Sequence, residues 1–170
     1  IKINKIISKN KSDVLYETEY KIKKAVERQL ISDVNLGVLL SGGVDSSLIT
    51  ALALKYKKDL NAFTIFFNKG NEDEMADDFK YAKFLSNDLS FKLNSINFNY
   101  NNIEQDIKNI IFFLEEPVAD LATLNLYYIT KLSKEMNYKV LLSGAGADDI
   151  FTGYRRHSAL YLQSKLGPLF

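Results

Sequence analysis

Two short apolar segments, each ending abruptly in a serine–glycine turn, constrain the fold of this chain most strongly. Residues 37–40 (GVLL) run directly into Ser41-Gly42-Gly43, and residues 139–142 (KVLL) run into Ser143-Gly144-Ala145-Gly146. Apolar runs of this length beside glycine turns are typical of strands buried inside a sheet. Ligands of parallel α/β sheets bind beyond the carboxyl ends of the strands, so we expect the chemistry at these two turns.

The rest of the chain alternates between patterns typical of strands and of helices. Residues 62–67 (AFTIFF) and 90–98 predict two further strands. The periodic apolar positions predict helices over 12–32, from 45 or 46 to about 56, over 72–87, from about 103 to before Pro117, over 121–136 and over 150–163. This alternation predicts an α/β fold in which helices sandwich a parallel sheet.

Composition excludes several classes of function. The chain has 170 residues, 46% of them hydrophobic, which is enough for one core. Its 22 Lys+Arg and 21 Asp+Glu give a net charge of +1, which favours neither nucleic acid nor an anionic membrane as a partner. Without cysteine it has no disulfide, thiolate zinc site or cysteine nucleophile. We expect a cytoplasmic domain, and the sequence leaves its oligomeric state open, a homodimer included.

The two ends of the sequence predict a piece of a longer protein. Residue 1 is Ile rather than Met, and residues 158–170 are rich in Leu, Tyr and Phe. Such an apolar segment either docks against another part of the protein or folds back on its own core.

The turn at residues 41–47 (SGGVDSS) has the composition of a phosphate-binding loop. Its two glycines allow positive φ and close approach of a ligand, and the following helix start directs amides and a positive dipole end into it. Ser41, Ser46 and Ser47 add hydroxyl donors. The loop lacks the lysine of the GxxxxGK-Ser/Thr pattern and the third glycine of the dinucleotide fingerprint.

Asp45 is the unexpected member of this loop, because a carboxylate repels bound phosphate. A divalent cation between the two removes the repulsion and takes the carboxylate as a ligand. The alternative is that Asp45 only caps the helix that follows.

The string SGGVDSS resembles the pyrophosphate-binding loop, SGGxDS, of the PP-loop ATP pyrophosphatase superfamily, whose fold is called adenine nucleotide alpha-hydrolase-like. Residues 142–154 (LSGAGADDIFTGY) resemble the LSGEGSDEIFGGY segment of glutamine-hydrolysing asparagine synthetases, and residues 32–40 (SDVNLGVLL) resemble their SDVPxGVLL run. Residues 63–65 and 116–117 also match that family, and the similarity extends over residues 18 to 160. Residues 1–170 are therefore expected to be a partial asparagine synthetase-like ATP-binding domain.

The resemblance implies an ATP and Mg²⁺ site built from both turns. Pyrophosphate or its magnesium would contact Ser41, Gly42, Gly43, Asp45, Ser46 and Ser47. Adenosine would lie against Leu39, Ile65 and Gly144, largely through backbone groups, and Ser143 would also belong to the nucleotide site. Asp45 and Asp148 would hold Mg²⁺ and act as the catalytic pair.

The implied reaction is adenylation of a carboxylate, aspartate or a related acid, with release of pyrophosphate. Ammonia from a glutaminase domain of the same parent protein would then form the amide and release AMP. A catalytic lysine of the family would lie beyond residue 170.

The second turn departs from the family at Ala145, where the family has a glutamate. Alanine has no acid–base function, so another residue acts, the acceptor differs or amide formation is impaired. Asp149 for Glu and Thr152 for Gly are milder changes. The alternatives are an amidotransferase paralogue acting on a sugar, peptide or small-metabolite carboxylate, and a non-catalytic ATP-binding module.

Other residues receive simpler interpretations. Residues 155–157 (RRH) are interpreted as surface residues of a helix, with a phosphate contact as the alternative. Glu115, Glu116 and Asp120 are candidates for substrate binding. The remaining assignments are a solvated helix face for Asp73, Glu74, Asp77 and Asp78, and the core for Phe112, Phe113, Tyr127 and Tyr128.

Overall fold

A parallel sheet forms the centre of the structure, a computed structural model that describes residues 10–67, 77–98, 102–116, 118, 120 and 122–166. The described strands are β1 (Leu36–Leu39), β2 (Asn61–Phe67), β3 (Lys92–Phe98) and β4 (Val140–Leu142), in the order β3-β2-β1-β4. Every neighbouring pair is parallel. The predicted strands and the predicted sheet type are confirmed.

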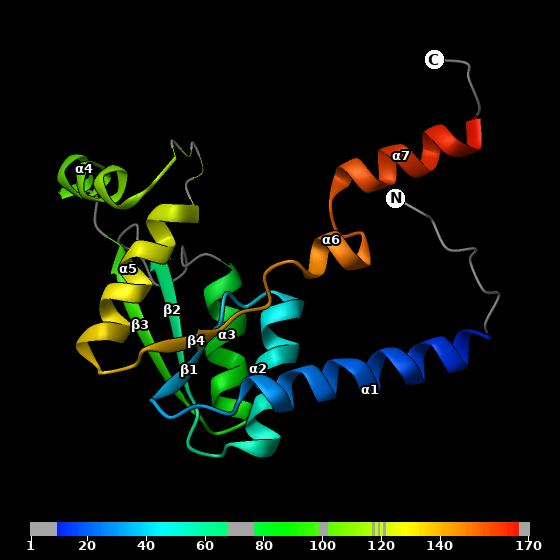
Figure 1. Ribbon diagram of the computed structural model, residues 1–170, viewed down its shortest axis with the longest axis horizontal. Coiled ribbons are helices and arrows are strands. Elements are labelled where there is room, and N and C mark those ends of the chain that lie inside the picture. Colours follow the sequence, from blue (N-terminus) through cyan, green and yellow to red (C-terminus); the bar gives the residue numbers. More distant parts are fainter. Residues whose placement is uncertain are drawn as a thin grey trace.

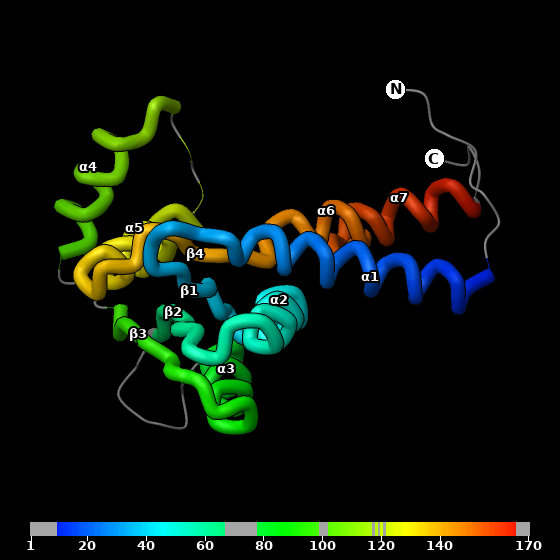
Figure 2. The backbone as a smooth tube through the Cα atoms, turned by 60° about the horizontal axis from the view of Figure 1, so that its bottom comes forward, coloured from blue at the N-terminus to red at the C-terminus, as the bar shows by residue number. Residues whose placement is uncertain are grey.

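Helices cover both faces of this sheet (Figures 1 and 2). α2 and α3 lie on one face and α5 on the other, while α1 packs against α2 and α4 against α5. Their bounds are α1 (Lys11–Gln29), α2 (Val44–Tyr56), α3 (Asp77–Asp88), α4 (Ile103–Phe113), α5 (Ala122–Glu135), α6 (Ala147–Phe151) and α7 (Arg155–Leu166). Residues 72–76 and 121 of the predicted helices lie outside the described residues. No helix in the described part of the chain is long and apolar enough to cross a membrane.

The core lies mainly between β1, α1 and α2. Val38 and Leu40 of the β1 segment are almost completely buried. Val26 is also buried, and Ile22 of α1 and Leu30, the residue directly after it, pack against the same cluster, which confirms the expected four-residue spacing.

The sequence prediction that Phe112 and Phe113 lie in the core is wrong. Phe112 and Phe113 are 84% and 74% exposed rather than buried, because α4 packs against α5 and contributes no buried residue to the core. Tyr128 is half-buried and meets the ring of Phe98 edge to face at 5.1 Å. Its hydroxyl donates to the Asp106 carboxylate, and burial, together with that carboxylate, raises the pKa of Tyr128 to about 12.

The single helix predicted over 150–163 is also wrong, because the structure has two helices separated at residues 152–154. Thr152 takes a left-handed conformation (φ 63°), and the Gly153 N–H donates to the Asp148 carbonyl at 3.0 Å, which ends α6. α6 and α7 extend away from the sheet (Figure 1), and the side chains of Leu160, Tyr161 and Leu162 are exposed.

Gly37 allows β1 to pack closely against β2. A Cβ added there would lie 2.7 Å from the Phe63 ring and 2.9 Å from the Asn61 carbonyl oxygen. Phe63 is fully buried and sits edge to face with Tyr138 at 5.0 Å, so its ring has little room to move. A side chain at position 37 would therefore disturb the strand that leads into the first turn.

We expect Gly37→Ala to lower the free energy of unfolding by about 1–3 kcal/mol, the usual cost of overpacking a core. Urea denaturation followed by circular dichroism measures this change. Gly43→Ala is the matched control, because its Cβ would meet only Ser41 Oγ at 3.4 Å, an ordinary contact. Equal stability of the two variants would contradict the predicted close packing.

Candidate functional site

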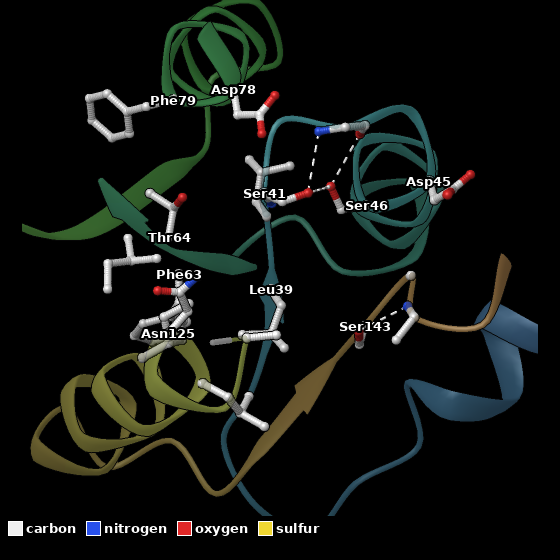
Figure 3. A pocket seen from close by; sticks show the side chains of 18 of the residues that line it. Leu39, Ser41, Asp45, Ser46, Phe63, Thr64, Asp78, Phe79, Asn125 and Ser143 are labelled. Atoms are coloured by element: carbon white, nitrogen blue, oxygen red, sulfur yellow. Dashed lines mark hydrogen bonds between the residues drawn. The ribbon is translucent and has the colours of Figure 1, made fainter. Parts of the chain in front are cut away.

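The two serine–glycine turns lie side by side at the carboxyl end of the sheet. β1 and β4 are neighbours, and their parallel pairing ends at Val38↔Leu142, one to three residues before the turns begin. A pocket of about 540 Å³ opens there (Figure 3), within the range of roughly 300–1,000 Å³ typical of ligand sites. Nine of the predicted site residues line it: Leu39, Ser41, Gly43, Asp45, Ser46, Ile65, Ser143, Gly144 and Asp148.

The hydroxyl of Ser46 holds the first turn in shape. Its Oγ accepts the Ser41 N–H at 3.2 Å, donates to the Gly43 carbonyl at 3.1 Å and lies 2.9 Å from Ser41 Oγ. Ser41 Oγ in turn accepts the Gly43 N–H at 3.3 Å. One hydroxyl has one donor and two acceptor positions, so these contacts use the full capacity of Ser46. The side chain of Ser46 therefore positions the loop.

The loop leads into the N-terminus of α2, where backbone donors are available. Gly43 is the N-cap residue and no side chain caps the helix, so the structure gives Asp45 no capping role. The first amides of a helix have no carbonyl partner within it, and the helix dipole makes this end favourable for an anion. Ser47 lies further in, with its N–H bonded to the Gly43 carbonyl at 3.1 Å.

Gly42 brings the first turn against the start of α3. It has a φ of 94°, and a Cβ there would lie 1.8 Å from the Asp78 carbonyl oxygen. Gly42 therefore allows the loop to pack against α3, and it does not line the pocket.

Asp78 is a site residue that the sequence interpretation missed. It was assigned to a solvated helix face, yet it lines the pocket, and Figure 3 shows its carboxylate on the side of Ser41. Asp78 reaches the pocket because of the way α3 packs on β2 and β3. The spacing of apolar and charged residues along α3 does not predict this packing.

The second turn touches the first backbone to backbone. A Cβ on Gly144 would lie 2.9 Å from both the Asp45 carbonyl carbon and the Ser46 nitrogen. Ser143 Oγ accepts the Ala145 N–H at 3.0 Å, and the Ala147 N–H donates to the Gly144 carbonyl at 3.3 Å. The glycine at position 144 is therefore required for the contact between the turns.

Two carboxylates flank this contact. Asp45 is half-buried and Asp148 is exposed at the start of α6, and both line the pocket. The Asp45 side chain points away from Ser41 and Ser46 in Figure 3. Among the described residues, no three His, Cys, Asp or Glu side chains cluster as a metal site would require on its own. Two carboxylates completed by phosphate oxygens and water form a ligand set that fits Mg²⁺.

Two of the other charged candidates, Asp149 and Asp120, have local partners. Asp149 forms an ion pair with Arg156 at 2.7 Å, and that guanidinium lies 4.2 Å from the centre of the Tyr154 ring. Asp120 Oδ1 accepts the Ala122 N–H at 2.9 Å at the start of α5. Glu115 and Glu116 are exposed, and Pro117 lies outside the described residues.

The wall of the pocket beyond the turns is formed by β2, which extends past β1. The β1–β2 pairing ends at Leu39↔Phe63, whereas the β2–β3 pairing continues to Phe67↔Phe98. The Phe63 carbonyl accepts the Leu40 N–H at 2.9 Å, so Phe63 directs its backbone groups toward β1. Residues two apart direct their groups to the same side, and those of Ile65 therefore face the space beyond the end of β1.

Two solved structures share this fold. The NH3-dependent NAD synthetase from Campylobacter jejuni subsp. jejuni NCTC 11168 has a TM-score of 0.53 at 18% identity, covering 82% of this chain and 60% of that one. The U34-tRNA thiolase NcsA from Methanococcus maripaludis has a TM-score of 0.55 at 21% identity, covering 94% of this chain and 55% of that one. At these identities the likeness shows the fold alone, a parallel sheet flanked by helices.

Sequence comparisons define the family more narrowly. The family model for asparagine synthase matches residues 17–170. A putative asparagine synthetase (glutamine-hydrolyzing) of Mycobacterium tuberculosis (strain ATCC 25618 / H37Rv) is 32% identical over 133 residues, covering 78% of this chain and 20% of that protein. Asparagine synthetase B (glutamine-hydrolyzing) of Escherichia coli (strain K12) is 30% identical over 156 residues, covering 81% of this chain and 27% of that protein. The chain belongs to the asparagine synthase family, and it spans about a fifth to a quarter of the length of these relatives.

We expect Gly42→Ala to destabilise the chain more than Gly146→Ala. Both glycines have positive φ, 94° and 89°, so alanine at either costs about 1–2 kcal/mol of backbone strain. Only Gly42 adds a collision with the Asp78 carbonyl oxygen, because nothing lies within 4 Å of a Cβ at Gly146. Urea unfolding of both variants measures the difference in the free energy of unfolding. Equal losses of unfolding free energy would show that α3 does not pack closely against the loop.

Proposed function

We propose that this chain is the ATP-binding part of an AMP-forming ligase that adenylates a carboxylate, aspartate or a related acid, for amide formation with glutamine-derived ammonia. The observation that carries the proposal is the contact of Gly144 with the backbone of Asp45 and Ser46. Because of this contact the second turn lies beside the N-terminus of α2, the end of a helix that favours an anion. Membership of the asparagine synthase family supports the same reaction.

The phosphates of ATP are assigned to the loop at residues 41–47. The amides at the start of α2 donate to phosphate oxygens, and Ser47 can add a hydroxyl donor. The hydroxyl proton of Ser41 is used in its contact with Ser46 Oγ, so Ser41 contributes to this part of the site by holding the loop. Ser46 keeps the loop in its shape through its bonds to Ser41 and Gly43. A loop fixed before the ligand arrives loses little conformational freedom on binding.

The adenosine is assigned to the wall formed by Leu39, Ile65, Ser143 and Gly144. Ile65 offers a backbone donor and acceptor beyond the end of β1, and Leu39 offers an apolar surface. Gly144 leaves room for a ligand beside the second turn, since a larger residue would already collide with Asp45.

Asp45 and Asp148 are proposed to hold Mg²⁺ together with phosphate oxygens. When bound, Mg²⁺ supplies Lewis acidity and neutralises charge on the pyrophosphate leaving group. The half-buried position of Asp45 strengthens its interaction with a cation relative to a fully solvated carboxylate.

The proposed reaction forms one bond and breaks one bond in each of two steps. A carboxylate oxygen attacks the α-phosphorus, and the bond to the β-phosphate oxygen breaks to release pyrophosphate. Ammonia then attacks the acyl carbon, the bond to the AMP oxygen breaks, and one ammonia proton leaves. The residues of this chain contribute positioning and electrostatic stabilisation of the phosphates.

A glutaminase domain in the same parent polypeptide is the proposed source of ammonia. The named relatives are described as glutamine-hydrolyzing, and this chain spans only 20–27% of their length. We therefore propose that residues 1–170 are one part of a longer cytoplasmic enzyme.

Ala145 favours a second candidate, an amidotransferase paralogue with another acceptor. Ala145 lines the pocket with a methyl group, so this position offers a substrate neither charge nor acid–base chemistry. A sugar, peptide or small-metabolite acid is the corresponding substrate class. Pyrophosphate exchange into ATP by the full-length protein identifies the acid, because exchange requires the correct carboxylate. ATP binding without exchange for any acid would identify a non-catalytic nucleotide-binding module.

We expect ATP to bind the 170-residue chain in a Mg²⁺-dependent manner, and Asp45→Ala to weaken binding at least about tenfold, or about 1.4 kcal/mol. Isothermal titration calorimetry with and without Mg²⁺ measures both effects. Asp88→Ala, an exposed carboxylate at the end of α3, is the matched control and should bind like wild type. ATP affinity indifferent to both Mg²⁺ and Asp45 would refute the cation bridge. No ATP binding by the folded chain would refute the site.

A further inference from the structure

Asn125 is a polar side chain in the pocket to which the proposed function gives no role. It belongs to α5 and lines the pocket together with Leu126 and Ile129. Figure 3 shows it beside Phe63, close to the strand that carries Thr64. An amide placed on an otherwise apolar stretch of wall distinguishes one part of the pocket chemically from the rest.

The amide of Asn125 makes no hydrogen bond within the part of the chain that the structure describes. The contrast with Asn94 is informative, since that half-buried amide donates to Asn61 Oδ1 at 3.1 Å and to the Ala62 carbonyl at 3.2 Å. Asn125 is half-buried as well, and with no partner among the described residues its amide is left to hydrogen-bond with water or a ligand in the pocket. A ligand that fills the pocket displaces this water and binds well only if it replaces the lost hydrogen bonds.

We propose that Asn125 reads the base of the bound nucleotide and selects adenine, an inference that rests on the ATP site proposed above. An asparagine amide matches the N6/N7 edge of adenine, because its oxygen accepts from the N6 amino group and its NH2 donates to N7. Guanine presents two acceptors, O6 and N7, on the same edge. The amide oxygen of Asn125 would then face another acceptor, so guanine is disfavoured.

This assignment is compatible with the backbone groups of Ile65. The N–H and C=O of Ile65 face the space beyond β1, and they match the N1 acceptor and the N6 donor of adenine. The amino group has two hydrogens, one for the Ile65 carbonyl and one for the Asn125 amide oxygen. Adenine is then read on two adjacent edges, by β2 and by α5.

The test compares ATP with 7-deaza-ATP, in which a C–H replaces N7. We expect wild type to bind ATP about tenfold more tightly than 7-deaza-ATP, because one hydrogen bond is lost. In Asn125→Leu this preference should disappear. In Asn125→Asp it should reverse, because a carboxylate oxygen repels the lone pair of N7 and tolerates the C–H. Calorimetry in the presence of Mg²⁺ provides the affinities, and circular dichroism verifies the fold of each variant.

Two controls separate base reading from a structural role. Asn87→Leu and Asn87→Asp make the same changes at an exposed position of α3 and should keep the wild-type preference. Inorganic pyrophosphate, which has no base, should bind wild type and both Asn125 variants equally. Equal loss of ATP and pyrophosphate binding in both Asn125 variants would overturn the proposal.

The remaining outcomes distinguish this proposal from the one on which it rests. A wild-type chain that binds ATP and 7-deaza-ATP equally, or Asn125 variants that keep the wild-type preference, would refute the role of Asn125 and leave the ATP site intact. A folded wild-type chain that binds neither ATP nor pyrophosphate would refute the ATP site itself.

Discussion

The parallel pairing of β1 with both β2 and β4 is the constraint on which the site depends. It aligns the carboxyl ends of the strands at one edge, so two turns separated by about a hundred residues of sequence become neighbours. Gly37 permits the close approach on one side of β1, and Gly144 permits the contact between the turns at its end. Glycine is required at both positions, because a single methyl group at either one would collide with backbone or a buried ring.

Within the first turn, the buried hydroxyl of Ser46 fixes the shape of the loop. Ser46 bonds to the backbone on both sides of the glycine pair, and Thr50 Oγ1 donates to the Ser46 carbonyl at 2.7 Å one turn further along α2. The loop and the first turns of its helix are thus connected by side-chain hydrogen bonds. These bonds hold the backbone donors at the start of α2 in a fixed arrangement.

Much of the fold and part of the site were predictable from sequence because they depend on local signals. Apolar runs that end in glycine turns defined β1 and β4, and four-residue spacing defined the buried side of α1. The break between α6 and α7 was missed, since the left-handed Thr152 interrupts a segment whose composition suits a helix. Phe112 and Phe113 were misplaced because an apolar helix gives no information on whether a neighbour covers it. Asp78 and Asn125 reach the pocket only through the packing of α3 and α5, which is a tertiary property.

The stagger between β1 and β2 has a consequence for how the site can change over time. The backbone N–H and C=O of Ile65 face the pocket because β1 ends before β2 does. Every residue except proline carries both groups, so substitutions at position 65 leave this part of the proposed adenosine-binding surface in place. A shortened β2 or a lengthened β1, by contrast, would remove these exposed backbone groups. The hydrogen-bonding groups on this side of the pocket therefore depend on the relative lengths of β1 and β2 and not on which side chain stands at position 65.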